Sequence, residues 1–465
     1  MRRISTAAAA VLIGISSLTG AEATEMEVEL YVDSETKQIY GGPGPGRQRL
    51  GRFAQIDDKP QPAAAAAPIP VHATPVAALA SSPAPTPKHW YDTINLRGYT
   101  QLRYNQGVGG DDRQLTAPGD RFIGDNQSFG IRRARLVFSG QLTEQVSFYI
   151  QPDLASTPTG STTSGFAQIR DAYFDVGLNK GNEIRVRAGQ SKVPYGWENL
   201  QSSSNRLAPD RADALNSGVR DERDLGVMFY YSPAVAQRRF ADLGKHNLKG
   251  SGDYGVLGVG FYNGQGANRS EGNNSLHTVV HATWPFQFDS GQYFEVGADA
   301  YVGKFKVATP TSIKANGSTF VPSVDAGKEG STDRRVAVHA IWFPQPFGLQ
   351  AEWTAGKGPE LDLDTRTIST KSLSGGYVQA MYSLSGSYGD LMPYLKWQTY
   401  RGASKFDTNT PRMTVFETEA GLEWQPNKTL ELTLSYAKMR RTDVRNAPYA
   451  LVRGDVLRMQ MQINY

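Results

Sequence analysis

Arginines recur at alternate positions of several short segments, and they are the residues of this chain best suited to binding chemistry. An arginine side chain is always charged, and its planar fork donates paired hydrogen bonds to carboxylate or phosphate oxygens. The arginines concerned are Arg97, Arg103, Arg132, Arg133, Arg185, Arg187 and Arg458. Where one face of each segment bounds a water-filled space, such side chains attract small anions.

Carboxylates hold the equivalent alternate positions in other segments. The inward-facing ones are Asp171, Asp175, Glu295, Asp299, Glu352, Glu417, Glu419, Glu423 and Glu431. This distribution predicts a basic wall facing an acidic wall, which produces a transverse field and not a deep anion well. Two roles stay open for the arginines, since they could attract anions or pair with these carboxylates to hold the structure rigid.

The sequence offers little for catalysis. It has no cysteine and six histidines, so thiol chemistry and cysteine zinc sites are excluded. His277 and His281 share one face of a strand, but neither an HExxH nor a GxSxG motif is present. We therefore expect no enzyme, no metal and no cofactor. A net charge of +4 is too small to indicate nucleic acid as a partner.

The N-terminal residues read as an export signal. Arg2 and Arg3 precede the apolar stretch from Ala7 to Leu18, and Ala21-Glu22-Ala23 forms a cleavage site. We expect a signal peptide over 1–23, a small periplasmic segment of unknown role over 24–59 and a Pro/Ala-rich linker over 60–92. The remaining residues, 93–465, form the main domain.

Polarity alternates through this domain, which predicts the strands that must carry the charged side chains. In the last segment Leu457, Met459 and Met461 share one face, whereas Arg458 and Gln460 share the other. Only every second residue of a membrane barrel strand faces lipid, so such strands escape a hydropathy scan. The sequence predicts an all-β fold, a transmembrane antiparallel β-barrel.

About sixteen strands are predicted, and the even number is what single-chain bacterial barrels require. They lie near 93–105, 128–140, 144–154, 167–178, 182–191, 222–232, 253–263, 275–286, 290–304, 332–343, 348–356, 374–383, 390–401, 412–424, 428–439 and 454–465. Short and long links alternate along the chain, as short periplasmic turns and long extracellular loops do. One link, residues 232–253, is long on the periplasmic side, so it is either an insertion or a slip in the strand count.

The phase of one strand is ambiguous, because Arg132, Arg133 and Arg135 do not fit one face of a regular strand. Leu136 sets a phase that places Arg133 inside, whereas Ile131 sets one that places Arg132 inside. A β-bulge would reconcile the two. We expect at least one of Arg132 and Arg133 to line the lumen.

Several segments resemble the phosphate-selective porin O and P family. They are FGIRRARLVFSGQL (Phe129–Leu142), FYIQPDLA (Phe148–Ala155), IRDAYFDV (Ile169–Val176), IRVRAGQSKVPYGWENLQSSSNRL (Ile184–Leu207) and RDLGVMFYY (Arg223–Tyr231). The resemblance implies a homotrimer with arginines along each lumen and a constriction loop folded inward. Lys192–Asp221 is placed to be that loop, which makes Lys192, Arg206, Arg211 and Arg220 constriction candidates.

These patterns together predict a porin of the Gram-negative outer membrane that passes small hydrophilic solutes by passive diffusion. We expect a modest preference for anions such as phosphate. Tyr465 ends the chain in phase with Met461, which resembles the C-terminal signal that the barrel-insertion machinery reads. A barrel enzyme and a non-transporting adhesin or structural barrel are the alternatives that the sequence leaves open.

Overall fold

The computed structural model describes residues 28–33, 39–40, 44–45, 47–53, 89–111, 115, 129–156 and 165–465. The chain divides into two units, residues 1–84 and 85–465. In the first unit β1 (Val28–Asp33) pairs with both β2 (Ile39–Tyr40) and β3 (Arg47–Phe53). The expected signal peptide, 1–23, and residues 60–88 of the expected linker lie outside the described residues.

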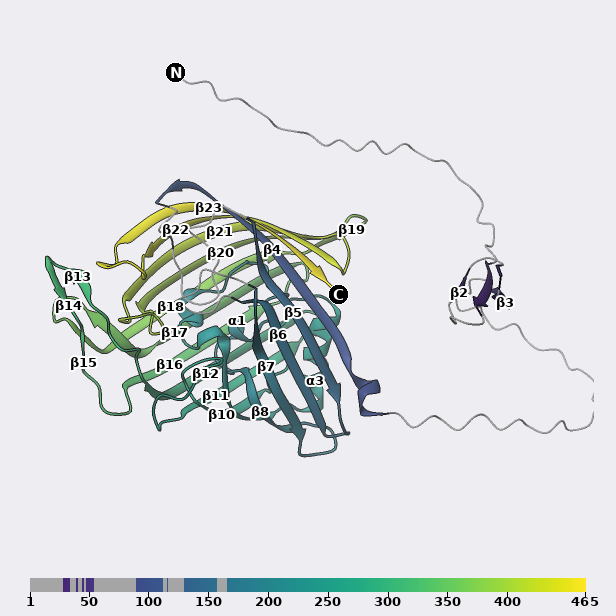
Figure 1. The fold of residues 1–465 in the computed structure, drawn as a ribbon, viewed down its shortest axis with the longest axis horizontal. Coiled ribbons are helices and arrows are strands. Elements are labelled where there is room, and N and C mark those ends of the chain that lie inside the picture. Colours follow the sequence, from purple (N-terminus) through teal and green to yellow (C-terminus); the bar gives the residue numbers. More distant parts are fainter. Residues whose placement is uncertain are drawn as a thin grey trace, which may run out of the picture. The chain divides into compact units, whose positions relative to one another are not determined.

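The second unit is a closed antiparallel β-barrel of sixteen strands, which confirms the predicted fold class (Figure 1). The wall strands are β4 (Asn95–Gly110), β5 (Phe129–Gln141), β6 (Val146–Ser156), β7 (Phe166–Gly177), β8 (Ile184–Lys192), β9 (Arg223–Tyr231), β10 (Leu257–Tyr262), β11 (His277–Gln287), β12 (Tyr293–Phe305), β16 (Ser331–Trp342), β17 (Phe347–Asp362), β18 (Thr367–Tyr382), β20 (Gly389–Ala403), β21 (Arg412–Gln425), β22 (Leu430–Thr442) and β23 (Leu451–Asn464). Each predicted strand overlaps one of these.

Short strands decorate the two ends of the barrel. The β13 (Ile313–Ala315) and β14 (Ser318–Phe320) hairpin projects from one end, with β15 (Ser323–Val324) beside it, and β19 (Leu384–Gly386) projects from the other (Figure 1). A short helix, η1 (Trp90–Thr93), precedes β4. No helix among the described residues is long and apolar enough to span a membrane.

Side chains alternate between the lipid and the lumen along each wall strand. On β22, Leu434 and Tyr436 are exposed outside, whereas Thr433, Ser435 and Ala437 are buried inside. Successive residues of a strand point to opposite faces, so the apolar half contacts lipid and the polar half turns inward. The inward half supplies the charged side chains of the lumen.

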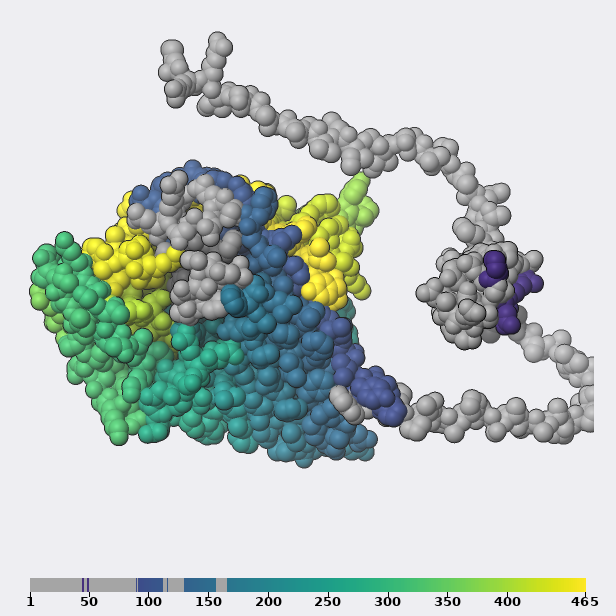
Figure 2. Space-filling model, viewed as in Figure 1, coloured from purple at the N-terminus to yellow at the C-terminus, as the bar shows by residue number. Residues whose placement is uncertain are grey.

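The barrel closes where the first wall strand meets the last. β4, dark blue, lies beside β23, yellow (Figure 2). The Gly98 amide donates to the Tyr465 carbonyl at 2.6 Å, and the Tyr465 amide donates to the Gly98 carbonyl at 3.0 Å. A Cβ at Gly98 would lie 2.5 Å from the Tyr465 ring, so glycine makes room for the terminal aromatic side chain.

One end of the barrel has short turns, and this is the periplasmic end of an outer-membrane barrel. The exception is the link over 232–256, which contains the twelve-residue helix α3 (Ala234–Lys245). β9 and β10 pair in register on either side of it. The long link is therefore an insertion, and the strand count is correct.

Deleting Tyr465 is expected to reduce the amount of folded barrel in the outer membrane severalfold, because it removes the backbone bonds that join β23 to β4 beside Gly98. The readout is cell fractionation followed by unheated gel electrophoresis. Tyr465→Phe is the control, because it loses only the hydroxyl contact with Thr100 at 3.2 Å. Normal yield of the deletion variant would contradict the prediction.

Candidate functional site in the barrel lumen

The connection between β8 and β9 folds into the lumen, and we call residues 193–222 the constriction loop. It contains α1 (Trp197–Leu200), α2 (Asp213–Asn216) and η3 (Arg220–Glu222). α2 contacts β17, β18 and β20, which lie across the ring from β8. The loop thus spans the lumen from one wall to the other, with α1 inside the ring of strands (Figure 1).

Carboxylates on β12 and β17, which are separated by only β16 in the barrel wall, hold the first turn of the constriction loop. Glu352 on β17 accepts hydrogen bonds from the amides of Trp197 at 2.6 Å and Glu198 at 3.1 Å. Asp299 on β12 accepts one from the Gly196 amide at 2.8 Å. The first amides of a helix have no partner within it, so the wall supplies acceptors for them. Two residues predicted for an acidic lumen wall thus anchor the loop.

Two histidines lie against this anchor. His281 Nδ1 is 2.5 Å from Asp299 Oδ1, and ligand atoms of Asp299, His339 and Glu352 lie within 4.8 Å of one another. The carboxylate oxygens of Asp299 and Glu352 already accept bonds from the loop amides and from His281. Anchoring of the loop accounts for this cluster. Glu295, next to it, accepts the Trp197 indole N–H at 3.0 Å.

Arginines on β4, β22 and β23 bind acidic residues of the constriction loop. Arg103 on β4 pairs with Asp210 at 3.0 Å, and Arg441 on β22 pairs with Asp213 at 2.6 Å. Arg458 on β23 lies 3.8 Å from the second oxygen of Asp210. All these side chains are buried, and a buried charge is stable only when it is paired.

A lysine on β20 also binds α1, in addition to the carboxylates on β12 and β17. Lys396 on β20 forms an ion pair with Glu198. Burial by itself would raise the pKa of Glu198, but Lys396 and then Arg206 outweigh it and hold this pKa below its ordinary value. The carboxylate therefore stays charged and bonded to the wall at neutral pH.

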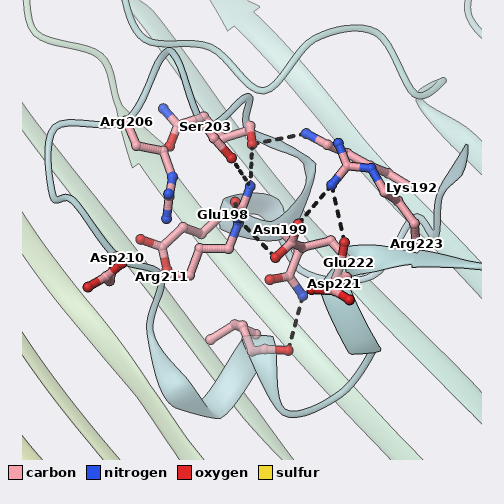
Figure 3. Close-up of polar contacts among 12 residues, drawn as sticks. Lys192, Glu198, Asn199, Ser203, Arg206, Asp210, Arg211, Asp221, Glu222 and Arg223 are labelled. Atoms are coloured by element: carbon pink, nitrogen blue, oxygen red, sulfur yellow. Dashed lines mark hydrogen bonds and ion pairs between the residues drawn. The ribbon is translucent and has the colours of Figure 1, made fainter. Parts of the chain in front are cut away.

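The base of the constriction loop is a compact ion-pair network (Figure 3). Glu222 pairs with Arg211 at 3.0 Å and with Arg223 at 2.9 Å, and Arg223 also pairs with Asp171 at 2.9 Å. Lys192 donates to the carbonyls at the end of α1, Leu200 at 2.6 Å and Gln201 at 3.0 Å. Lys192 and Arg211, both expected in a constriction, thus brace the loop from within.

The remaining arginines predicted for the loop and for β5 differ in their surroundings. Arg206 is buried and donates to the Pro209 carbonyl at 3.2 Å, whereas Arg220 lies over the Phe406 ring at 5.7 Å. The β4–β5 register shifts by one residue, which leaves Arg132 in a bulge. Arg133 is buried and donates to Gln101 at 2.7 Å.

The sequence predicted a basic wall facing an acidic wall. In the structure the arginines and carboxylates are instead paired with one another, which is the second role left open for the arginines. Glu419 on β21 pairs with Arg458 on β23 at 2.8 Å, and Glu417 on β21 lies 3.4 Å from Arg441. Glu423 pairs with Lys249. β21 and β23 are separated by only one strand, and the long arginine side chain crosses that distance.

A cavity of about 700 Å³ lies between the constriction loop and the wall formed by β4 to β8. Its charged lining comprises Arg97, Arg187, Lys192, Arg223, Asp171 and Asp253. Ser202, Ser204, Tyr149 and Tyr173 also line it. Cationic side chains outnumber carboxylates in this lining by four to two.

Two predicted arginines, Arg97 and Arg187, line this cavity, and a third, Arg185, pairs with the lining residue Asp253. Arg187 pairs with Asp175 at 2.7 Å and stacks on the Tyr173 ring at 3.9 Å. Arg185 pairs with Asp253 at 2.8 Å. Arg97 is exposed and contacts the Tyr149 ring at 6.0 Å, and it makes no ion pair within the described part of the chain.

The family model of the phosphate-selective porin O and P matches residues 102–465, which covers nearly all of the barrel. The chain belongs to this family. The porin is therefore an outer-membrane channel for small solutes, located in the Gram-negative outer membrane. No curated protein matches the sequence significantly.

Solved outer-membrane proteins are similar to this porin over about the same part of the chain. The channel DcaP of Acinetobacter baumannii is 16% identical, with a TM-score of 0.49, over 80% of this chain and 97% of that one. Salmonella typhi OmpF in complex with daunomycin is 13% identical, with a TM-score of 0.49, over 80% and 97%. OprB of Pseudomonas putida is 8% identical, with a TM-score of 0.46, over 81% and 95%.

Sequence reasoning missed several residues that position the constriction loop. Asp210 and Asp213, Lys396 and Arg441 were not singled out, although each forms a buried ion pair. The acidic residues of the segment PDRAD were a usable signal, since a loop expected to enter an arginine-rich lumen needs carboxylates there.

Glu352→Ala is expected to loosen the first turn of the constriction loop in this porin. The change removes the acceptor for the amides of Trp197 and Glu198. A hydrogen bond to a charged group contributes about 1.5–3 kcal/mol, so exchange of these two amides should accelerate about tenfold or more. Hydrogen–deuterium exchange of the folded protein in detergent measures this.

The matched control is Gln350→Ala, two residues earlier on the same face of β17. Gln350 accepts a hydrogen bond only from Gln379, at 3.1 Å, among the contacts of the described residues. Equal exchange rates at Trp197 and Glu198 in the two variants would show that Glu352 does not anchor the loop.

Proposed function

We propose that this channel is a passive-diffusion porin with a modest preference for small anions, phosphate among them. The cavity between the constriction loop and β4–β8 carries the proposal, because cations exceed carboxylates in its lining. Arg97 is exposed there, and no ion pair of the described residues neutralises it. An arginine fork at a wet surface attracts phosphate and related oxyanions.

The preference is modest because the other arginines at the cavity, and Arg185 beside it, are neutralised locally. Asp253 pairs with Arg185, Asp175 with Arg187, and Asp171 with Arg223. A paired charge has little field beyond a Debye length, about 8 Å in physiological salt. Neutral solutes therefore pass as well, and anion selectivity fades at high salt.

A non-enzymatic role also fits the contacts of the histidine and carboxylate side chains that lie next to the constriction loop. His281 lies against Asp299, and Asp299 holds the Gly196 amide. The groups from which a barrel enzyme would draw its acid and base thus serve as anchors for the constriction loop. The adhesin alternative predicts no ionic conductance, so the following experiment decides between the two.

Arg97→Ala is expected to reduce anion preference. Purified wild-type protein in a planar bilayer should show discrete conductance steps, with a reversal potential on the anion side in a dilute KCl gradient. The reversal potential of the variant should lie closer to the cation side than that of the wild type, because one positive charge is lost from the cavity. This difference should diminish in concentrated salt.

Lys428→Ala is the control, since it removes the same charge from an exposed periplasmic turn outside the cavity lining. Absence of conductance steps in the wild type would refute the channel proposal. An Arg97→Ala shift no larger than that of the control would refute the role of Arg97 alone.

We also propose that the barrel assembles as a homotrimer, as the family resemblance implies. Part of the apolar outer wall would then contact a second copy in place of lipid. Light scattering of the protein purified in mild detergent should give three times the mass of one chain. A monomeric mass at micromolar concentration would contradict this.

A further inference from the structure

The long periplasmic link over 232–256 is far longer than its two strands require. Tyr231 and Leu257 are direct partners in the β9–β10 ladder. A turn of about two residues joins such a pair in an ordinary hairpin. The contacts that the additional residues make in the lumen therefore indicate their role.

The first part of the link is α3, which packs toward the constriction loop. Its buried residues are Ala236, Phe240 and Leu243. They share one apolar cluster with Trp197 of α1. Three or four positions separate them, so they lie on one face of the helix. α3 therefore supports the constriction loop from its periplasmic side.

After α3 the link reaches the opposite wall. Lys249 forms an ion pair with Glu423 on β21 at 2.5 Å, and Asn247 donates to Gln425 at 2.8 Å. β21 lies halfway around the ring from β9. The Lys249–Glu423 pair is buried, and burial by itself would lower the pKa of Lys249, but Glu423 and then Glu431 raise it above its ordinary value. This lysine stays charged and bonded to the far wall.

The link then returns to its starting wall across the cavity. Asp253 pairs with Arg185 on β8 at 2.8 Å. Residues 250–254, together with Phe240 and Gly244, line the same cavity as Arg97. The link thus forms one side of the space through which solutes would move.

The link is also fastened to the constriction loop. Gln201 donates to the Lys249 carbonyl at 2.6 Å, and Asn205 donates to the Gly250 carbonyl at 2.7 Å. The two inserted segments, one from each end of the barrel, therefore form a single braced body in the lumen.

We propose that residues 232–256 form a crossbar that bounds the solute path from the periplasmic side and sets, with the constriction loop, the size limit of the pore. The inference rests on the proposed channel function. On this proposal solutes are confined to the cavity beside β4–β8, because α3 and the Lys249 attachment cross the lumen from β9 to β21. This role rests on the space that the link occupies, since its charged residues Lys249 and Asp253 are paired with Glu423 and Arg185.

Replacement of residues 232–256 by Asn-Gly tests the crossbar. The remaining strands can join directly, because Tyr231 and Leu257 are paired. Removal of one wall of the narrowest passage should raise single-channel conductance about twofold or more and admit larger neutral polyethylene glycols. Lys245→Ala is the control, because this exposed side chain bonds only to Asp242 among the described residues.

A gentler variant keeps the test decisive if the deletion does not fold. Lys249→Met combined with Glu423→Gln and Glu431→Gln removes the ionic part of the far attachment together with both carboxylates that Lys249 faces. This variant should raise conductance or add larger substates. If the wild-type protein forms channels but every variant that folds has the same conductance and the same polymer exclusion as the wild type, the crossbar proposal alone is overturned. A wild-type protein without channels would overturn the proposed function, and the crossbar with it.

Discussion

Every backbone amide and carbonyl of the wall must find a partner within the ring of strands, because lipid offers none. That requirement forces the first and last strands together, and Gly98 and Tyr465 exchange two backbone bonds where they meet. Closure also fixes the alternation of side chains, since each strand then has one face in lipid and one in the lumen. Charged residues are driven inward by the cost of exposing them to lipid. A lumen crowded with arginines and carboxylates is the consequence.

Such a lumen is stable only if its charges are paired, and the constriction loop supplies the missing partners. Its carboxylates, Asp210 and Asp213, bind Arg103 and Arg441 of the wall. In the other direction, the wall carboxylate of Glu352 accepts the free amides at the start of α1. Loop and wall are thus complementary in two ways, by opposite charges and by donors facing acceptors. The crossbar adds apolar packing against Trp197.

The sequence was sufficient for features that depend on local rules. Strand number and the inward phase of Arg97 and Arg458 follow from how a strand meets lipid. The alternation of short and long links holds less strictly, because β17 and β18 extend beyond their predicted ends and the link between them, expected over 357–373, spans only 363–366. Even the bulge at Arg132 was visible, as a conflict between neighbouring phases. The path of the constriction loop was not, because it depends on contacts between distant residues such as Arg103 and Asp210. Two opposed walls were expected from strand phase alone, which ignores the reach of an arginine to the next carboxylate.

Pairing also explains why a count of lumen arginines is a poor guide to selectivity. An arginine bonded to a carboxylate, such as Arg458 beside Glu419, contributes to rigidity and leaves almost no net field in the pore. The wall position of Arg97 is different, because this side chain lies exposed at the cavity and is neutralised by no ion pair of the described residues. Selectivity in this barrel therefore depends on the few charges that the loop and crossbar leave unpaired. The inserted segments that narrow the pore therefore also determine how much unpaired charge lines the path of a solute.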